Sequence, residues 1–164
     1  ELGLDFSILV SRKLPIPDNP EAGFGAVAED GSLFIIEDVS RWIPEDMIGK
    51  IVEEQKRVIL KRISDLRQNR RFPEIVGRTV ILTDDGIAMG STMRAAVEMC
   101  RNKKAGRIVV AVPVSGTSTA KEIAGLVDEM IVLETPPNFR AVAQAYRNWH
   151  DVTDQEVMDY IGEA

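Results

Sequence analysis

The 164-residue sequence contains one cysteine, Cys100, and one histidine, His150, and only 5% of its residues are aromatic. A single cysteine excludes an internal disulfide, and one Cys with one His excludes a metal site built from those residue types. The sequence also lacks an apolar run near the ~20 residues of a membrane-spanning helix, and it shows no secretory signal. The sequence also has no excess of basic residues, because 26 acidic residues outnumber 20 basic ones and give a net charge of −6. We therefore expect a cytoplasmic protein that binds neither a membrane nor nucleic acid.

The composition is otherwise that of a globular protein, with 45% hydrophobic and 28% charged residues. The length predicts a single domain over residues 1–164. In the first part of the chain, the apolar run Phe6–Val10 predicts a buried strand, and the three prolines within 14–20 predict a loop. An Asp-Gly pair separates the strand-like runs Phe24–Ala28 and Leu33–Ile36, which predicts a β-hairpin.

The rest of the sequence alternates between helical and strand-like periodicity. Pro44 suits the first turn of a long helix, whose apolar residues recur at helical spacing as far as Gln68. Two Thr-x-x-Glu patterns, Thr119–Glu122 and Thr153–Glu156, predict capping boxes. Strands that alternate with helices and are apolar on both faces predict a mostly parallel α/β sheet flanked by helices. The predicted helices span 44–68, 91–103, 118–126 and 153–161, the predicted strands span 79–83, 107–112 and 130–133, and 139–149 fits either a helix or an irregular cover.

Residues 80–93 carry the clearest functional signal. An apolar strand ends in Asp84 and Asp85, and a loop of small residues between Gly86 and Gly90 then opens a helix. Because the first backbone N–H groups of a helix have no partner within the helix, they favour an anion such as phosphate. The two carboxylates instead suit the hydroxyl groups of a ribose, or a hydrated metal ion. The stretch therefore predicts a ribose 5-phosphate site beyond the carboxyl end of a strand, where α/β sheets bind their ligands.

Other interpretations of residues 80–93 fit less well. A nucleotide-binding P-loop needs GxxxxGK[ST], whereas Gly86 and Gly90 have a different spacing and no following Lys. A response-regulator receiver has no use for a glycine-hydroxyl loop directly after its acidic pair, and a dehalogenase-type phosphatase has Asp-x-Asp rather than Asp-Asp-Gly. A solvated turn that caps the helix stays open as the interpretation without a function.

The apolar strand, the acidic pair, the spacer and the small and hydroxyl residues of 80–93 resemble the phosphoribosyl pyrophosphate motif of type I phosphoribosyltransferases. The resemblance implies that Asp84 and Asp85 bind the ribose hydroxyls and that Ala88–Thr92 wrap the 5-phosphate. Met89 departs from the family, which usually has Thr there, and so removes one phosphate-binding hydroxyl. With a basic pair upstream, the implied substrate-binding residues are Arg12, Lys13, Asp84, Asp85, Gly86, Ile87, Ala88, Met89, Gly90, Ser91 and Thr92.

The resemblance extends over nearly the whole chain, to a bacterial and archaeal subgroup of predicted phosphoribosyltransferases. It implies a mostly parallel sheet flanked by helices, with a β-hairpin insertion and a small C-terminal hood. The family also has a β-α unit with a pyrophosphate loop upstream of the basic pair, and the residues before Val10 leave no room for it. The chain is therefore expected to lack its first β-α unit. The matching segments are Val10–Lys13, Asn19–Glu21, Gly25–Val27, Glu134–Pro136 and the aromatic residues within 139–149.

The implied activity is the magnesium-dependent transfer of ribose 5-phosphate from phosphoribosyl pyrophosphate to a nitrogen base, with release of pyrophosphate, in an enzyme expected to form a homodimer. Asp84, Asp85 and Lys13 are the implied catalytic residues. Mg²⁺ is expected mainly on substrate and water oxygens near the two carboxylates, with no residue assigned as a direct ligand. The alternative is a regulatory module that binds phosphoribosyl pyrophosphate or a nucleotide without turnover.

The acceptor base is the part of this hypothesis that the sequence specifies least. Val114 follows the strand next to the motif, and Tyr146 and Trp149 lie in the segment expected to form the hood. Aromatic rings there either stack on a planar base or pack as part of the core. These three residues are the expected acceptor pocket, and the identity of the base stays open.

Overall fold

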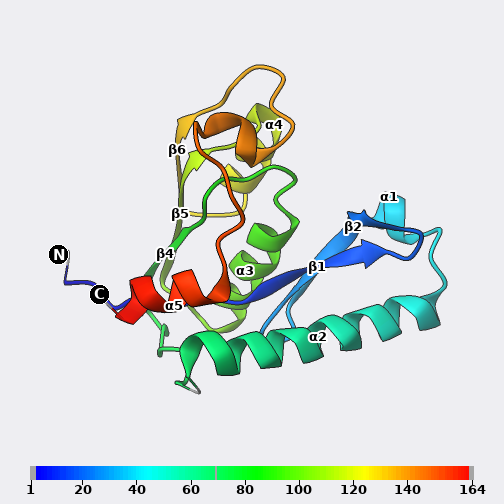
Figure 1. Ribbon diagram of the computed structural model, residues 1–164, viewed down its shortest axis with the longest axis horizontal. Coiled ribbons are helices and arrows are strands. Elements are labelled where there is room, and N and C mark those ends of the chain that lie inside the picture. Colours follow the sequence, from blue (N-terminus) through cyan, green and yellow to red (C-terminus); the bar gives the residue numbers. More distant parts are fainter. Residues whose placement is uncertain (1–2, 69, 163–164) are drawn as a thin grey trace.

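The structure, a computed structural model, describes residues 3–68 and 70–162. These residues form two three-stranded sheets, one antiparallel and one parallel, together with the helices that pack on them (Figure 1). The architecture confirms the predicted α/β class with a parallel sheet, flanking helices and a β-hairpin region. The elements are β1 (Ser11–Ile16), β2 (Asn19–Ala28), β3 (Leu33–Ile35), α1 (Glu37–Ser40), α2 (Glu45–Arg67), β4 (Thr79–Thr83), α3 (Ser91–Asn102), β5 (Arg107–Val114), α4 (Thr117–Ala124), β6 (Glu129–Glu134), the 3₁₀ helix η1 (Val142–Ala145) and α5 (Asp154–Gly162).

The parallel sheet and α3 enclose the main hydrophobic core. β4 pairs with β5 from Thr79, opposite Arg107, to Thr83, opposite Ala111, and β6 pairs in parallel with the other side of β5. Alternate residues of these strands point toward α3 and α4, as the two-residue period of a strand requires. The buried residues of this core are Ile75, Leu82, Ile87, Met93, Ala96, Val97, Cys100, Ile108, Val110, Val112 and Ile123.

The opposite face of the parallel sheet is apolar but largely open among the described residues. Ile81 of β4 is 53% exposed, and Ile131 and Leu133 of β6 are 44% and 77% exposed. Parallel sheets are usually covered on both faces, which is why their strands are apolar on both. The strands of this sheet are thus apolar on both faces, but α3 and α4 pack on only one face.

Cys100 lies fully buried on α3, in contact with the parallel-sheet core. Removal from water disfavours the thiolate and raises the pKa of the thiol to about 11, with the charge of Asp30 as a smaller contribution. The thiol is therefore protonated near neutral pH, and the side chain acts as a small apolar group. Cys100 is therefore a packing residue of the core.

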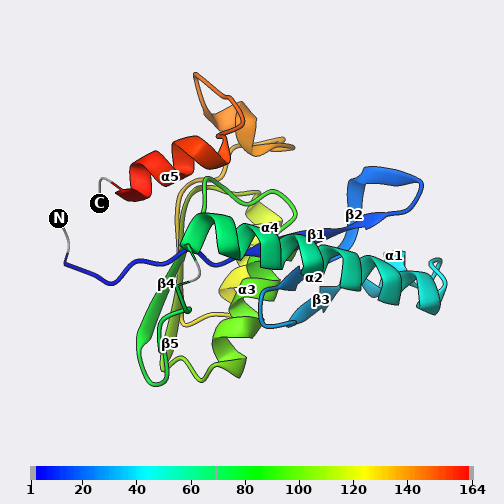
Figure 2. The same cartoon turned by 60° about the horizontal axis from the view of Figure 1, so that its bottom comes forward.

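The antiparallel sheet consists of two consecutive hairpins between α2 and α3 (Figure 2). β2 and β3 pair with Ala26 opposite Phe34, so the hairpin predicted from the Asp-Gly pair is confirmed. Gly31 has a φ of +92° in this turn, where a side chain would be strained. Asp30 accepts hydrogen bonds from the backbone N–H and the hydroxyl of Ser32, at 2.8 Å each, and these bonds fix the turn.

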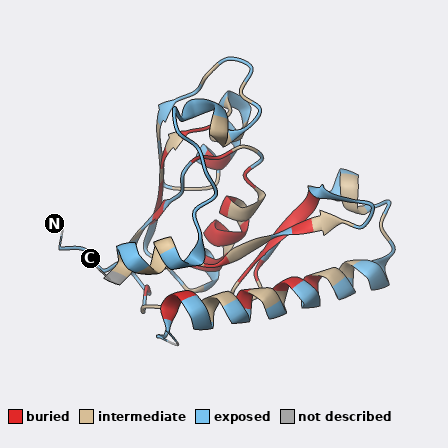
Figure 3. Cartoon of the chain, viewed as in Figure 1, coloured by how far each residue is buried: buried red, intermediate tan, exposed pale blue. Residues whose placement is uncertain are grey.

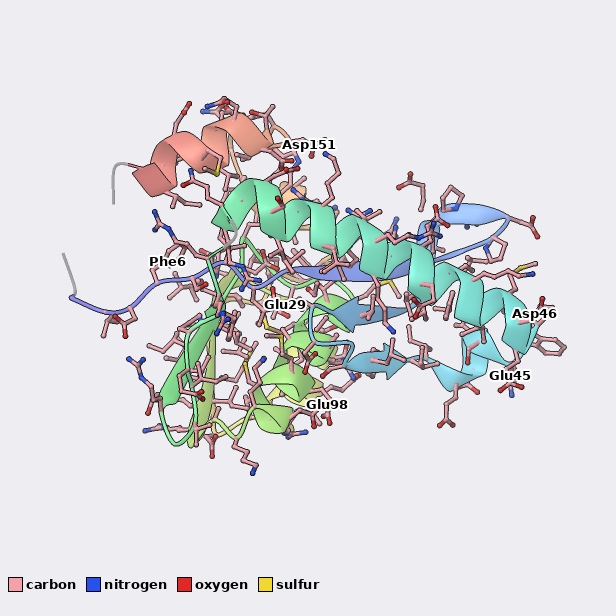
Figure 4. All side chains as sticks on the ribbon, turned by 90° about the horizontal axis from the view of Figure 1, so that it is seen from below. Phe6, Glu29, Glu45, Asp46, Glu98 and Asp151 are labelled. Atoms are coloured by element: carbon pink, nitrogen blue, oxygen red, sulfur yellow. The ribbon has the colours of Figure 1, made fainter. Side chains whose placement is uncertain are left out.

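Helix α2 buries one side against this antiparallel sheet and leaves the other in solvent (Figure 3). In its last turn, Arg67 forms an ion pair with Glu29 at 3.0 Å, and the two side chains are only 8% and 6% exposed. The other Glu29 oxygen accepts the backbone N–H of Val10 at 3.1 Å. One buried carboxylate, labelled in Figure 4, therefore joins the end of α2, the end of β2 and the N-terminal segment.

Two early segments differ from the sequence predictions. Phe6–Val10 is not a strand, because these residues pair with no strand of the described chain and Val10 donates to a side chain instead. The predicted loop at 14–20 is a hairpin between β1 and β2, with Ile16 opposite Asn19. Proline is tolerated there because β1 is an edge strand and its register shifts on both sides of Pro15.

The C-terminal part runs from the hood (residues 139–149) back to α5, which packs against α2 (Figure 1). Within the hood, η1 is the only regular element of this stretch, so the ambiguous segment is mostly irregular. The predicted capping box at α5 is confirmed, since Thr153 and Glu156 exchange hydrogen bonds through side chains and backbone. Arg62 of α2 pairs with Asp154 of α5 at 2.6 Å.

Over the described part of the chain, the helices include none with the length and apolar character of a membrane crossing.

The buried ion pair generates a stability prediction. We expect Glu29→Gln to lower the free energy of unfolding by about 3–5 kcal/mol, because the Arg67 charge then lies buried without a counter-ion. Gln keeps the size of Glu and an oxygen for the Val10 N–H, so the loss reports the missing charge. Denaturant titration of both proteins measures it.

Lys61→Gln is the matched control, since it removes an ion pair with Asp65 that lies exposed on the same helix. Exposed pairs contribute little, so this variant should unfold almost as the wild type does. Equal stability of Glu29→Gln and wild type would contradict the role of the buried pair.

Candidate functional site

The loop between β4 and α3 lies beyond the carboxyl end of the parallel sheet, in the position expected for a ligand site. It borders a cavity of about 270 Å³. Strands of the antiparallel sheet and the hood complete the walls, so the cavity draws on three parts of the fold. The lining residues are Lys13, Gly23, Asp84, Gly86, Ile87, Ala88, Met89, Gly90, Ser91, Thr92, Met93 and Val142.

Most of the sequence-predicted site residues meet at this cavity. They are Lys13, Asp84 and the whole run Gly86–Thr92. Asp85 does not line the cavity. Its backbone N–H donates a hydrogen bond to Asp84, and its backbone carbonyl accepts one from Tyr146. Three lining residues, Gly23, Met93 and Val142, were not predicted. Only Met93 had a usable signal, because it lies in the first turn of the helix that the motif opens.

The loop is fastened to the neighbouring strand rather than free. The Ile87 N–H donates to the Val114 carbonyl at 2.9 Å, and the Gly116 N–H donates to the Ile87 carbonyl at 3.3 Å. These bonds form an isolated parallel bridge between Ile87 and Ser115, beyond the last pair of β4 and β5. The loop therefore keeps the register of the sheet and holds its shape before a ligand binds.

Two glycines are required by this close packing. A Cβ on Gly86 would lie 2.6 Å from Val114 Cγ1 and 2.8 Å from Val142 Cγ1, closer than real contacts allow. Gly90 has a φ of +77°, and a Cβ there would also meet Thr119. Gly90 is the N-cap residue of α3 and provides no side-chain cap, so the first N–H groups of the helix are available to an anion in the cavity.

Asp84 and Asp85 have different environments although they are neighbours. Asp84 lines the main cavity and also a smaller one of about 70 Å³, and its Oδ1 accepts the Asp85 N–H at 3.0 Å. Removal from water raises the pKa of Asp84, the Asp85 charge adds to this, and the backbone hydrogen bond opposes it. Its place at the cavity makes Asp84 the carboxylate of the pair that a ligand can reach.

The basic pair on β1 is divided between two faces. Lys13 lines the cavity, and its Nζ donates to the Glu21 carbonyl at 2.6 Å. Arg12 points to the opposite face, where its Nε donates to Gln55 of α2 at 3.2 Å. Adjacent residues of a strand point to opposite sides, so the structure brings only Lys13 to the site.

The expected acceptor residues lie next to the acidic pair. Val114 is buried against Gly86, as described above, and the Tyr146 hydroxyl donates to the Asp85 carbonyl at 2.6 Å. The ring of Trp149 lies 5.4 Å from that of Tyr146, tilted by 56°. Tyr146 is 37% exposed and Trp149 43% exposed, so both rings keep surface that a planar ligand can cover.

The oxygen donors at the cavity suit a hard cation such as Mg²⁺, because carboxylate and hydroxyl oxygens are its preferred ligands. Across residues 3–68 and 70–162, no cluster of three or more His, Cys, Asp or Glu side chains is arranged to hold a metal ion. A cation here would therefore take most of its ligands from substrate and water. Asp84 is the carboxylate placed to contact such a complex.

Comparisons with known proteins agree with this geometry. The family model described as "Phosphoribosyl transferase domain" matches residues 30–148. Two curated proteins of Mycobacterium tuberculosis, "Putative phosphoribosyl transferase MT0597" (strain CDC 1551 / Oshkosh) and "Putative phosphoribosyl transferase Rv0571c" (strain H37Rv), are each 37% identical over 159 residues. The alignment covers 96% of this chain but only 36% of each relative, so the chain spans about a third of their length.

A solved structure extends the likeness to the fold. The crystal structure of TT1426 from Thermus thermophilus is similar with a TM-score of 0.78 and 32% sequence identity. The similarity covers 99% of this chain and 77% of that one. Because the family model matches well over half of the sequence and includes the loop that borders the cavity, this chain belongs to the phosphoribosyl transferase domain family.

Proposed function

We propose that the chain forms the active site of a magnesium-dependent phosphoribosyltransferase, which transfers ribose 5-phosphate from phosphoribosyl pyrophosphate to a nitrogen base and releases pyrophosphate. The observation that supports this most directly is the content of one cavity. It brings Asp84 and Lys13 together with the uncapped start of α3. An anion site, a carboxylate that can accept hydrogen bonds from hydroxyl groups and a cation in one cavity suit the three parts of that substrate.

In this proposal, each part of the substrate has its own partners. The N–H groups at the start of α3 and the hydroxyls of Ser91 and Thr92 hold the 5-phosphate. Asp84 accepts hydrogen bonds from the ribose hydroxyls, and Lys13 exchanges the Glu21 carbonyl for a pyrophosphate oxygen. Asp85 holds Asp84 through its N–H and the hood through its carbonyl, so its contribution is mainly to shape the site.

The reaction breaks the bond between ribose C1 and a pyrophosphate oxygen and forms a bond from C1 to a nitrogen of the base. Positive charge develops at C1 in an oxocarbenium-like transition state, as in other glycosyl transfers. The nitrogen loses a proton, and Asp84 is the carboxylate at the cavity that is available to take it up. Bound Mg²⁺ would supply neutralisation of the negative charge on pyrophosphate.

We place the acceptor base beside the hood, next to the cavity. Tyr146 and Trp149, which do not line the cavity itself, offer exposed ring surface there for stacking, and Val114 packs against Gly86. Stacking accepts any planar ring, so this surface supports a nitrogen heterocycle as the class of acceptor.

A second candidate function is a module that binds phosphoribosyl pyrophosphate or a nucleotide without turnover. The placement of the basic pair favours it, because Arg12 is bound to Gln55 and the Lys13 ammonium is held by the Glu21 carbonyl. A site that holds phosphate and ribose but contributes little to the leaving group would bind its substrate and turn it over slowly or not at all.

Turnover separates these two functions. We expect the protein to bind phosphoribosyl pyrophosphate with Mg²⁺ in calorimetry, and to release pyrophosphate when one member of a panel of purine, pyrimidine and pyridine bases is added. Binding with no release across the panel would favour the regulatory module. Absence of binding to the wild type would overturn both.

The two carboxylates should differ in their effect on substrate binding. We expect Asp84→Asn to weaken binding of phosphoribosyl pyrophosphate about tenfold or more, because hydrogen bonds to a charged group contribute roughly 1.5–3 kcal/mol. Asp85→Asn is the matched control, and it should weaken binding less because its side chain does not line the cavity. Calorimetry at constant Mg²⁺ measures both, and equal losses would contradict the assignment.

The Asp84→Asn variant also checks the cause of the raised pKa of Asp84. An Asp whose pKa is higher in the folded than in the unfolded state costs stability at neutral pH, and that cost falls as the pH drops through the folded pKa. Asp84→Asn should therefore unfold at the same or a higher temperature than wild type. A clear drop in unfolding temperature would mean that the charge stabilises the fold.

Met89 provides a gain-of-affinity test of the phosphate position. Met89→Thr should tighten binding of ribose 5-phosphate several-fold, because one added hydrogen bond contributes about 0.5–1.5 kcal/mol. Met89→Leu keeps an apolar side chain of similar size and should leave the affinity unchanged. Titration of ribose 5-phosphate measures both, and no gain with Thr would place the phosphate away from residue 89.

A further inference from the structure

Thr119 makes a contact that its sequence pattern did not predict. The predicted capping box with Glu122 is absent, because Gly116 is the N-cap of α4 and no side chain caps this helix. The Thr119 hydroxyl instead donates to the Ala88 carbonyl in the loop between β4 and α3, at 2.9 Å. Glu122 is paired with Arg94 of α3 at 2.6 Å. Both members of the expected box therefore bind the elements that form the candidate site.

This hydrogen bond fixes the orientation of one peptide group. In a trans peptide, the carbonyl of one residue and the N–H of the next point in opposite directions. Because the Ala88 carbonyl points to Thr119 on α4, the Met89 N–H points away from α4. Ala88 and Met89 line the cavity and Thr119 does not, so we expect the Met89 N–H on the cavity side of the loop.

Thr119 also limits the shape of the loop where α3 begins. Its Cγ2 lies 2.9 Å from the position that a Cβ on Gly90 would take, and the side chain of Ile123 from the same helix lies 3.0 Å from that position. Ile123 is fully buried in the core of the parallel sheet. The first turns of α4 thus form a rigid support behind residues 88–90.

We propose that Thr119 is a positioning residue for the 5-phosphate, which turns the Met89 N–H into the anion site by holding the Ala88 carbonyl on the far side. The inference rests on the proposed function, since it assigns the phosphate to this loop. Without the hydroxyl, the peptide between Ala88 and Met89 is free to rotate. Rotation presents the carbonyl oxygen to the phosphate. The partial negative charge of that oxygen then repels the charged phosphate.

Thr119→Val removes the hydroxyl and keeps the shape and the methyl contact with Gly90. We expect it to weaken ribose 5-phosphate binding up to about tenfold, because losing a hydrogen bond of about 0.5–1.5 kcal/mol lets the free loop populate the rotated peptide and lowers the fraction that is competent to bind. Thr119→Ser should restore most of the affinity because it restores the donor. Thr117→Val changes an exposed Thr of the same helix turn and should bind as wild type does.

The amide signal of Met89 in ¹⁵N-labelled protein distinguishes positioning from a general structural role. In wild type and Thr119→Ser, this signal should shift strongly when ribose 5-phosphate is added, and in Thr119→Val the shift should be lost. Thermal unfolding of each variant is measured alongside. Equal affinity and an equal Met89 shift in Thr119→Val would overturn the inference while leaving the proposed function standing. No binding by wild type would overturn both.

Discussion

The candidate site depends on parallel pairing that continues past the end of the sheet. After Thr83, the chain leaves β4 for the acidic pair, and it returns to the register of β5 at the bridge between Ile87 and Ser115. This bridge leaves no space for a side chain at residue 86, so Gly86 follows from it. α3 begins at Ser91, shortly after this bridge, so the sheet also holds the backbone amides at the start of α3, where we propose that phosphate binds.

Side-chain contacts from several elements attach the other parts of the site to this loop. Tyr146 connects the hood to the acidic pair, Thr119 connects α4 to the loop, and the Glu29–Arg67 pair joins α2 to the sheet that carries Lys13. Each contact comes from a different element.

Local sequence patterns predicted the turns, helices and loops that are determined by residues close together in the chain. The Asp-Gly turn, the long helix after Pro44 and the loop of residues 84–92 all have their determining residues close together in the chain. The features that local patterns did not predict depend on residues that are distant in the chain. Pro15 is accepted in β1 because that strand is at an edge, Arg12 is drawn away by Gln55, and Thr119 has its partner 31 residues away.

The chain spans about a third of the length of the curated relatives, and its extent as a single domain stays a prediction. Within the described residues, β4 is a terminal strand of the parallel sheet, and the face that carries Ile81 and Leu133 is exposed. Parallel sheets are usually covered on both faces, so this exposed apolar face departs from the usual arrangement.

The buried thiol of Cys100 has a practical consequence. Thiol reagents attack the thiolate, which the raised pKa and the surrounding core both suppress. Labelling therefore requires α3 to separate from the parallel sheet. The amides to which we assign the phosphate lie at the other end of α3, so the labelling rate of this one cysteine measures how often that helix opens, and a bound ligand that holds the helix should slow the labelling.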